Sequence, residues 1–243
     1  MRLPPAMARG ARARTRSNRT WLAAAFIVVA LHADPAAALP PGFVVDNPMS
    51  TATFMFPTQI AFLPDGRRLV AEKDGKIWVV TPVGIRLNSP FLDLTARVLS
   101  TGDRGLLGMA IDPDFAQNRW LYVLYTADPD SNGADTEAET WSRLERYQMG
   151  SPDSNHADLS SRQVLIGRAW PDGIPDPSRD FTHVIGTLRF GADKTLLVGS
   201  GDAAGFRVVD PGGLDPDAFL PGRTDPSQDI GAFRAQSLNS MCG

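Results

Sequence analysis

Residues 103–115 read Asp-Arg-Gly-Leu-Leu-Gly-Met-Ala-Ile-Asp-Pro-Asp-Phe, and residues 121–125 read Leu-Tyr-Val-Leu-Tyr. Two apolar runs separated by an Asp-Pro-Asp turn predict a strand, a turn and a second strand. Residues 60–72 and 188–198 share this layout, each with an aspartate in the turn. The aligned aspartates Asp65, Asp114 and Asp193 are 49 and 79 residues apart. The sequence therefore contains a loose repeat of strand pairs.

This repeat favours the blades of a β-propeller. In the first unit, Asp74-Gly75 predicts a hairpin turn to a third strand at 77–80, and in the second unit residues 143–147 predict a further strand. The wider second interval contains polar or Pro-rich insertions near 127–140 and 171–180. With 22 Gly and 20 Pro in 243 residues, the fold class is expected to be all-β. An ordinary β-sandwich is the alternative.

The N-terminal residues predict export. Residues 1–31 carry six Arg and no acid, and an apolar run at 21–31 leads to Ala36-Ala37-Ala38, which matches a cleavage site. We interpret residues 1–38 as a signal peptide, with 39–243 as the mature part in the periplasm or outside the cell. An uncleaved N-terminal anchor is the alternative, but the apolar run is short for a membrane span. We therefore expect no membrane-spanning segment after cleavage of the signal peptide.

The composition excludes several functions. After residue 31 the chain holds 18 basic and 27 acidic residues, so nucleic-acid binding is not expected. The one cysteine, Cys242, can form no internal disulfide. The sequence contains neither a G-x-S-x-G nucleophile elbow nor a nucleotide-binding glycine fingerprint between a strand and a helix.

One histidine stands out among three. His183 precedes the third repeat unit, and Asp202 follows it in Gly199-Ser200-Gly201-Asp202. If residues 184–190 and 196–200 pair as antiparallel strands, His183 and Asp202 fall at the same end of the hairpin. A carboxylate beside an imidazole orients the ring for proton abstraction. A purely structural histidine is the alternative interpretation.

A second motif has the spacing of calcium ligands. Residues 128–139 satisfy D-x-D-x-N-G-x5-E, the pattern of an EF-hand loop. The predicted side-chain ligands are Asp128, Asp130, Asn132 and Glu139. The preceding residues 120–126 read as a strand, where an EF-hand has a helix, so a solvated acidic insertion between strands is the alternative.

Four stretches in order resemble the glucose/sorbosone dehydrogenase family of soluble quinoprotein sugar dehydrogenases. They are 39–66, 91–115, 183–202 and 235–243, of which 103–115 is the most specific. The resemblance implies a six-bladed β-propeller that holds pyrroloquinoline quinone (PQQ) at its mouth and uses calcium to activate the quinone. About 205 residues follow the predicted signal peptide, enough for roughly the first three to four blades.

The family implies an exported oxidoreductase that oxidises an aldose or related sugar, with PQQ as hydride acceptor and an external electron acceptor. His183 takes the place of the general base, and Asp202 that of the carboxylate that orients it. Asp103 falls where some members place a cofactor-contacting residue, and Arg104 beside it is a second cofactor-binding candidate.

The resemblance also leaves a non-catalytic alternative open. Thr182 stands where some quinoprotein members have Asp, and residues 203–207 lack the Gln that contacts the quinone in the glucose enzymes. A secreted propeller that binds carbohydrate or a protein partner is therefore the second hypothesis. A stretch of three to four blades is also expected to fold less stably by itself, because an open propeller leaves strand edges unpaired.

Overall fold

The computed structural model describes residues 40–44, 52–131, 140–151, 154–169, 172–176 and 182–201. The predicted signal peptide and Cys242 lie outside these residues. The described residues from 52 onward belong to one compact unit, and residues 40–44 belong to a separate one. In the larger unit almost every element is an antiparallel strand, which confirms the all-β prediction.

The first sheet is a four-stranded meander in the order β1-β2-β3-β4. Its strands are β1 (Pro57–Phe62), β2 (Arg68–Glu72), β3 (Lys76–Val80) and β4 (Leu92–Asp93), followed by the 3-10 turn η1 (Thr95–Arg97). The predicted Asp74-Gly75 hairpin is confirmed, because Gly75 N donates to Glu72 O at 3.0 Å and Leu69 pairs with Val79.

The second sheet has the order β5-β6-β7-β8. Its elements are β5 (Leu106–Ile111), the one-turn helix α1 (Phe115–Asn118), β6 (Trp120–Thr126), β7 (Thr140–Met149) and β8 (Ala157–Ile166). The strand predicted at 143–147 is confirmed within β7. A short strand β9 (Ile174–Asp176), inside the Pro-rich insertion, pairs with the start of β7. The two predicted insertions thus border or join this sheet.

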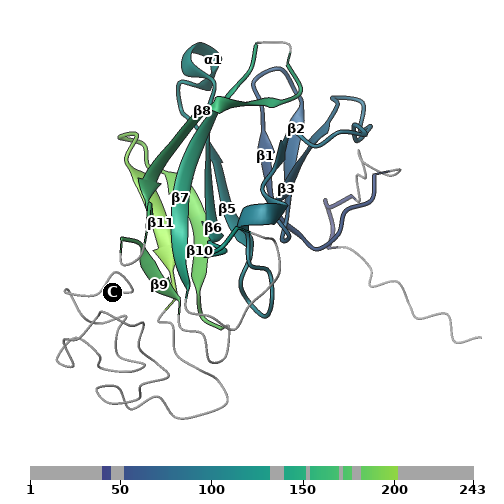
Figure 1. Cartoon of the computed structure of the whole chain (residues 1–243). Coiled ribbons are helices and arrows are strands. Elements are labelled where there is room, and N and C mark those ends of the chain that lie inside the picture. The colour runs from purple at the N-terminus through teal and green to yellow at the C-terminus, as the bar shows by residue number, and fades with distance from the viewer. Residues whose placement is uncertain are drawn as a thin grey trace, which may run out of the picture. The chain divides into compact units, whose positions relative to one another are not determined.

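The third sheet is the hairpin of β10 (Ile185–Phe190) and β11 (Leu196–Ser200). All three repeat units are therefore strand pairs, at β1–β2, β5–β6 and β10–β11. In Figure 1 the first sheet lies on the right and the other two overlap to its left, and the contacts of β5 with both β1 and β10 place the second sheet between the first and the third. The β-sandwich alternative is wrong, because a sandwich has two packed sheets and here three follow in series.

Both faces of the middle sheet are buried. One apolar core lies between the first and second sheets and includes Leu69, Ile77, Leu121 and Val123, all inaccessible to solvent. A second core lies between the second and third sheets and includes Leu124 and the almost fully buried Leu188. Each such side chain contributes about 1.5–3 kcal/mol to folding.

The first strands of the three sheets, β1, β5 and β10, lie next to one another. Thr58 Oγ1 on β1 donates to Leu106 O on β5 at 2.7 Å, and Met109 N donates to Gln59 Oε1 at 2.7 Å. On the other side, Gly108 lets β10 approach: a Cβ there would lie 3.0 Å from Leu188 Cγ and 2.9 Å from Leu124 Cβ. This arrangement is that of successive propeller blades, whose first strands line the central axis.

A buried polar network crosses the outer half of the second sheet. The Glu145 carboxylate is fully buried on β7 and accepts from Arg162 Nε at 2.9 Å and from the Tyr147 hydroxyl at 2.6 Å. Arg143 Nη1 lies 4.0 Å from the same carboxylate. Buried charges persist only when they are paired and hydrogen-bonded, so this network fixes β7 against β8.

The tyrosines of the chain should resist ionisation. The sequence has three tyrosines, and burial raises the pKa of Tyr122 and Tyr147, and raises that of Tyr125 to about 12, helped by the nearby Glu145 carboxylate. At pH 11 roughly 90% of unfolded tyrosines are ionised. The native protein should therefore show less phenolate absorbance at about 295 nm at that pH than the unfolded chain does.

Stability should fall over the same pH range. Because the folded pKa values lie above the unfolded value, the tyrosine contribution is complete below about pH 10 and is lost as the pH rises through the folded values. Urea midpoints measured from pH 9 to 12 should decline, and a control in 8 M urea should give the full absorbance. Full phenolate absorbance at pH 11 with an intact circular dichroism spectrum would contradict this prediction.

Candidate functional site

The site is built around the hairpin of the third sheet. Ile185 on β10 pairs with Ser200 on β11, and Gly201 N donates to Val184 O at 2.5 Å. This confirms the predicted antiparallel pairing and places His183 beside the end of β11. Asp202, the predicted orienting carboxylate, lies outside the described residues, so its place beside His183 stays a prediction.

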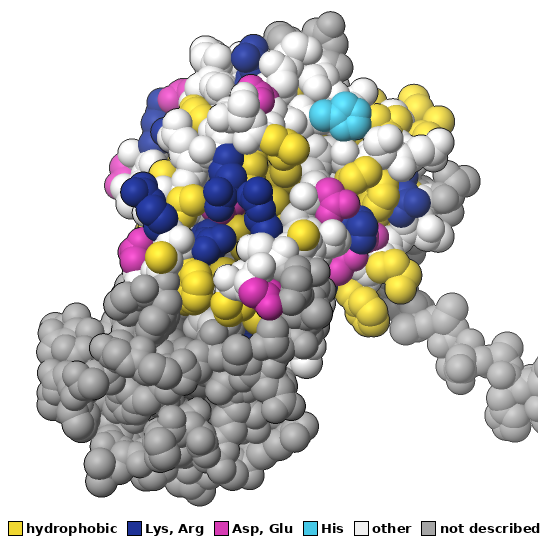
Figure 2. All heavy atoms as spheres, in the orientation of Figure 1, with side chains coloured by type: hydrophobic (Ala, Val, Ile, Leu, Met, Phe, Trp, Pro, Cys, Tyr) yellow, Lys and Arg dark blue, Asp and Glu magenta, His cyan; other side chains and the backbone are white. Residues whose placement is uncertain are grey.

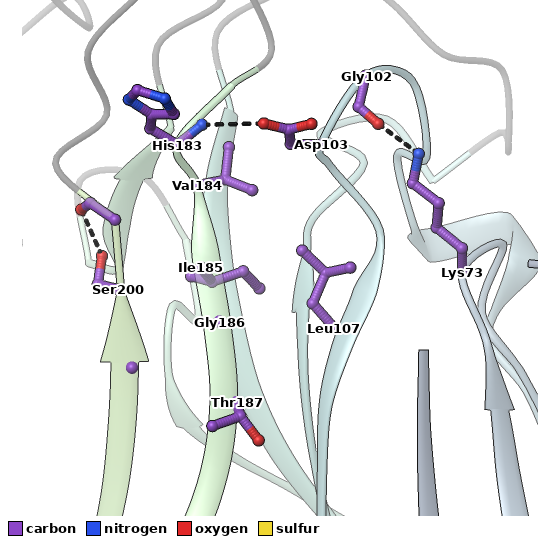
Figure 3. A pocket seen from close by; sticks show the side chains of 12 residues that line it. Lys73, Gly102, Asp103, Leu107, His183, Val184, Ile185, Gly186, Thr187 and Ser200 are labelled. Carbon is purple, nitrogen blue, oxygen red and sulfur yellow. Dashed lines mark hydrogen bonds between the residues drawn. The ribbon is translucent and has the colours of Figure 1, made fainter. Parts of the chain in front are cut away.

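His183 has an unusual backbone. Its φ is +53°, in the left-handed region that non-glycine residues rarely adopt, and its side chain is exposed. The backbone N–H of His183 donates to Asp103 Oδ2 at 3.3 Å, which joins the third sheet to the loop before β5 (Figure 3). Strain of this kind persists where the surroundings enforce it, and it is frequent at functional sites.

Gly201 is the residue that makes room for this backbone. A Cβ at Gly201 would collide with the carbonyl oxygen of His183 and would lie 2.7 Å from Val184 O. Backbone atoms cannot move aside as a flexible side chain can. Only glycine fits at this position, and the turn at His183 depends on it.

Replacing Gly201 with alanine should therefore disturb both folding and the turn at His183. We expect the free energy of unfolding to fall by about 2–3 kcal/mol, as for other overpacked positions. Urea denaturation measures this loss. Gly186→Ala is the matched control on the same hairpin, because a Cβ there would meet nothing closer than 3.8 Å. Equal stability of the two variants would contradict the prediction.

A hollow of about 690 Å³ lies beside His183. Its wall comes from the turn after β2, the loop before β5 with the start of β5, and both strands of the third sheet. The lining residues are Lys73, Gly102, Asp103, Leu107, His183, Val184, Ile185, Gly186, Thr187, Gly199, Ser200 and Gly201. Figure 3 shows Asp103 pointing toward the His183 backbone and Lys73 across the loop from it. The volume lies in the range of sites for small molecules and cofactors.

The two predicted cofactor-binding residues have different surroundings. Asp103 lines the hollow, whereas the adjacent Arg104 is fully buried and is not part of its wall. The structure thus brings Asp103 together with His183 but does not bring the Arg104 side chain to the hollow.

Lys73 is a site residue that the sequence did not reveal. Its ammonium donates to Gly102 O, and its backbone carbonyl accepts from Leu106 N at 2.9 Å. It lies in a hairpin turn of the first sheet, 110 positions before His183, in no recognisable motif. Packing of β1 against β5 brings that turn to the site, and no local pattern encodes this contact.

The predicted calcium loop is described only in part. Asp128 is buried just after β6, and its carboxylate accepts from Asp130 N at 3.2 Å. Asn132 and Glu139 lie outside the described residues. Over the described ranges, no group of three or more His, Cys, Asp or Glu side chains is placed to hold a metal ion. Calcium binding by this loop stays a prediction.

A comparison with protein families decides the relationship. The profile described as "Glucose / Sorbosone dehydrogenase" matches residues 54–211, which is more than half of the chain. The chain belongs to the glucose/sorbosone dehydrogenase family. The match includes β1 through β11 and the site around His183, so the resemblance drawn from the motifs is confirmed.

Sequence relatives include proteins without a dehydrogenase name. The chain is 30% identical over 148 residues to Hedgehog-interacting protein from Homo sapiens, which covers 56% of this chain and 19% of that protein. It is 28% identical over 177 residues to HIPL2 protein from Arabidopsis thaliana, at 58% and 25% coverage. The match spans about a fifth to a quarter of the length of these relatives.

Similar solved structures are sugar dehydrogenases. A putative glucose dehydrogenase from Thermus thermophilus matches with 29% identity and a TM-score of 0.47, over 61% of this chain and 38% of that one. The PQQ-bound aldose sugar dehydrogenase from Streptomyces coelicolor matches with 23% identity and a TM-score of 0.47, over 72% and 49%. Within the described residues, no helix has the length and apolar character needed to cross a membrane.

Proposed function

We propose that the chain belongs to an exported quinoprotein dehydrogenase that oxidises an aldose or related sugar. The observation that carries this proposal is the exposed imidazole of His183 at a hollow of about 690 Å³, on a backbone held by Asp103. Family membership supports the reaction class, and the basic, apolar N-terminal segment supports export to the periplasm or outside the cell.

The residues of the hollow fit a flat, anionic quinone such as PQQ in three respects. The volume is adequate for a cofactor, and the Lys73 ammonium at the wall can pair with a carboxylate. The glycines at 186, 199 and 201 have no side chains to fill the hollow on the side of the third sheet. Lys73 is the described residue that would pair with the carboxylates of such a group, and Asp103, the predicted cofactor-contacting residue, lies at the same wall. When bound, the quinone supplies the hydride acceptor for the reaction.

His183 is proposed to act as the general base. A sugar hydroxyl loses its proton to an imidazole nitrogen while the hydride of the same carbon leaves, so that the alcohol becomes a carbonyl. Asp103 acts as a positioning residue, because its carboxylate accepts from the backbone N–H of His183. Asp202 remains the proposed partner of the His183 imidazole. The two electrons removed from the sugar pass on to an external acceptor.

Aldose-dependent dye reduction tests this proposal. The full chain is incubated with PQQ and calcium, and reduction of a redox dye is followed with a panel of aldoses. The proposal expects turnover that requires PQQ and saturates with sugar. Absence of PQQ-dependent turnover in a protein that unfolds cooperatively would overturn it.

A non-catalytic binding module is the second candidate. It is favoured by the 30% identity to Hedgehog-interacting protein, a family relative whose name describes an interaction. Under this function the same hollow would bind carbohydrate or a protein partner. The dye assay separates the two functions, because a binding module folds yet reduces no dye with any aldose.

A further inference from the structure

A second, smaller pocket of about 230 Å³ lies on the seam between the first and second sheets. It is separate from the hollow at His183 and shares none of its lining residues. Its wall consists of Asp93, Leu94, Ala96, Arg97, Tyr147 and Leu159, from the end of β4, η1, β7 and β8.

Arg97 is the cation of this pocket. Arg97 is half-buried, and its guanidinium donates to the Tyr147 hydroxyl at 3.3 Å. Within the described residues, the guanidinium makes no other hydrogen bond. A guanidinium carries five N–H donors in a planar fork that matches a carboxylate. Most of the donor capacity of Arg97 is therefore available to a ligand in the pocket.

The buried network behind the pocket adds positive charge. Tyr147 donates its hydroxyl proton to the Glu145 carboxylate, which also holds Arg162 and lies 4.0 Å from Arg143. Two arginines and one carboxylate leave this network with one net positive charge. On the face drawn in Figure 2, basic side chains gather over the region of β7 and β8.

The rest of the wall limits the charge and shape of the ligand. Asp93 is an acid at the pocket, where its carboxylate accepts from the N–H and hydroxyl of Thr95. It balances Arg97, so the pocket with its network carries about one positive charge, which suits a monoanion better than a dianion. Leu94, Ala96 and the 67% exposed Leu159 supply apolar surface.

We propose that this pocket binds a small organic monocarboxylate, with its carboxylate on Arg97 and its hydrocarbon part against Leu94 and Leu159. The volume holds about eight water-sized groups, at roughly 30 Å³ each, which is the size of a benzoate ion. For a ligand this small, a dissociation constant on the order of 1 mM is expected.

Isothermal titration of the full chain with sodium benzoate tests the site. We expect saturable binding, weakened at least about 10-fold in Arg97→Gln and less in Arg97→Lys, which keeps the charge but loses the fork. Leu159→Asp is a second test that leaves folding intact, because the side chain is exposed, and its new charge should repel the carboxylate. Arg189→Gln and Leu197→Asp, both exposed and outside the pocket, are the matched controls and should bind as wild type.

Three results would overturn the proposal. They are no saturable binding up to about 20 mM benzoate, equal binding by wild type, Arg97→Gln and Leu159→Asp, and binding of inorganic phosphate through Arg97 without binding of benzoate. Because dye reduction depends on His183 and this site does not, failure here leaves the proposed function standing.

Discussion

Replacing Glu145 with alanine should lower the free energy of unfolding by about 3 kcal/mol. The side chain is fully buried, and its removal leaves Arg162 and the Tyr147 hydroxyl without their shared acceptor and Arg143 without the nearby opposite charge. Breaking a buried ion pair from one side typically costs 3–5 kcal/mol. We place the effect at the lower end because the Arg162 side chain is 32% exposed and regains water. Urea denaturation followed by circular dichroism measures it.

Two further variants locate the source of this loss. Glu145→Gln keeps the shape and one acceptor oxygen, so it should cost less than Glu145→Ala. Asp114→Ala removes an exposed ion pair with Lys194, whose closest atoms are 2.7 Å apart, and should cost about 1 kcal/mol or less. A loss in Glu145→Ala no larger than that in Asp114→Ala would contradict the role given to the network.

Replacing His183 with alanine should lower kcat/KM for aldose oxidation by about 10²–10⁴-fold, the usual contribution of a general base. Dye reduction by the full chain with PQQ and calcium measures this ratio. His156→Ala is the matched control, because His156 is exposed and its Nδ1 contacts Pro90 O at 3.1 Å, outside the hollow. A decrease of only a few fold in His183→Ala would contradict its role as base.

Much of the fold follows from local patterns in the chain. The Asp74-Gly75 turn, the apolar runs around Asp65, Asp114 and Asp193, and the strand at 143–147 each predict an element that the structure contains. These signals work because turn chemistry and strand periodicity act over a few residues. The order of the sheets follows from the repeat, since consecutive blades of a propeller pack on one another.

The candidate site was only partly predictable. His183 and Asp103 stand in motifs, and the hairpin register that joins residues 184 and 201 could be inferred from alternating strands. Lys73 and Arg97 could not be inferred, because each reaches its pocket through contacts between sheets. Nor does the sequence show that Arg104 is buried while its neighbour Asp103 lines the hollow. That difference depends on how the loop before β5 packs against the turn after β2, where Lys73 donates to Gly102 O and accepts from Leu106 N.

The hollow at His183 is the proposed binding site of the quinone. An absorbance titration of PQQ into the full chain, with calcium present, tests it when wild type is compared with Thr187→Trp, which fills the hollow from an exposed position on β10. Leu197→Trp, on the neighbouring strand and outside the hollow, is the control. We expect saturable binding in wild type and Leu197→Trp and at least about 10-fold weaker binding in Thr187→Trp. Equal binding by all three proteins, or binding by none, would contradict it.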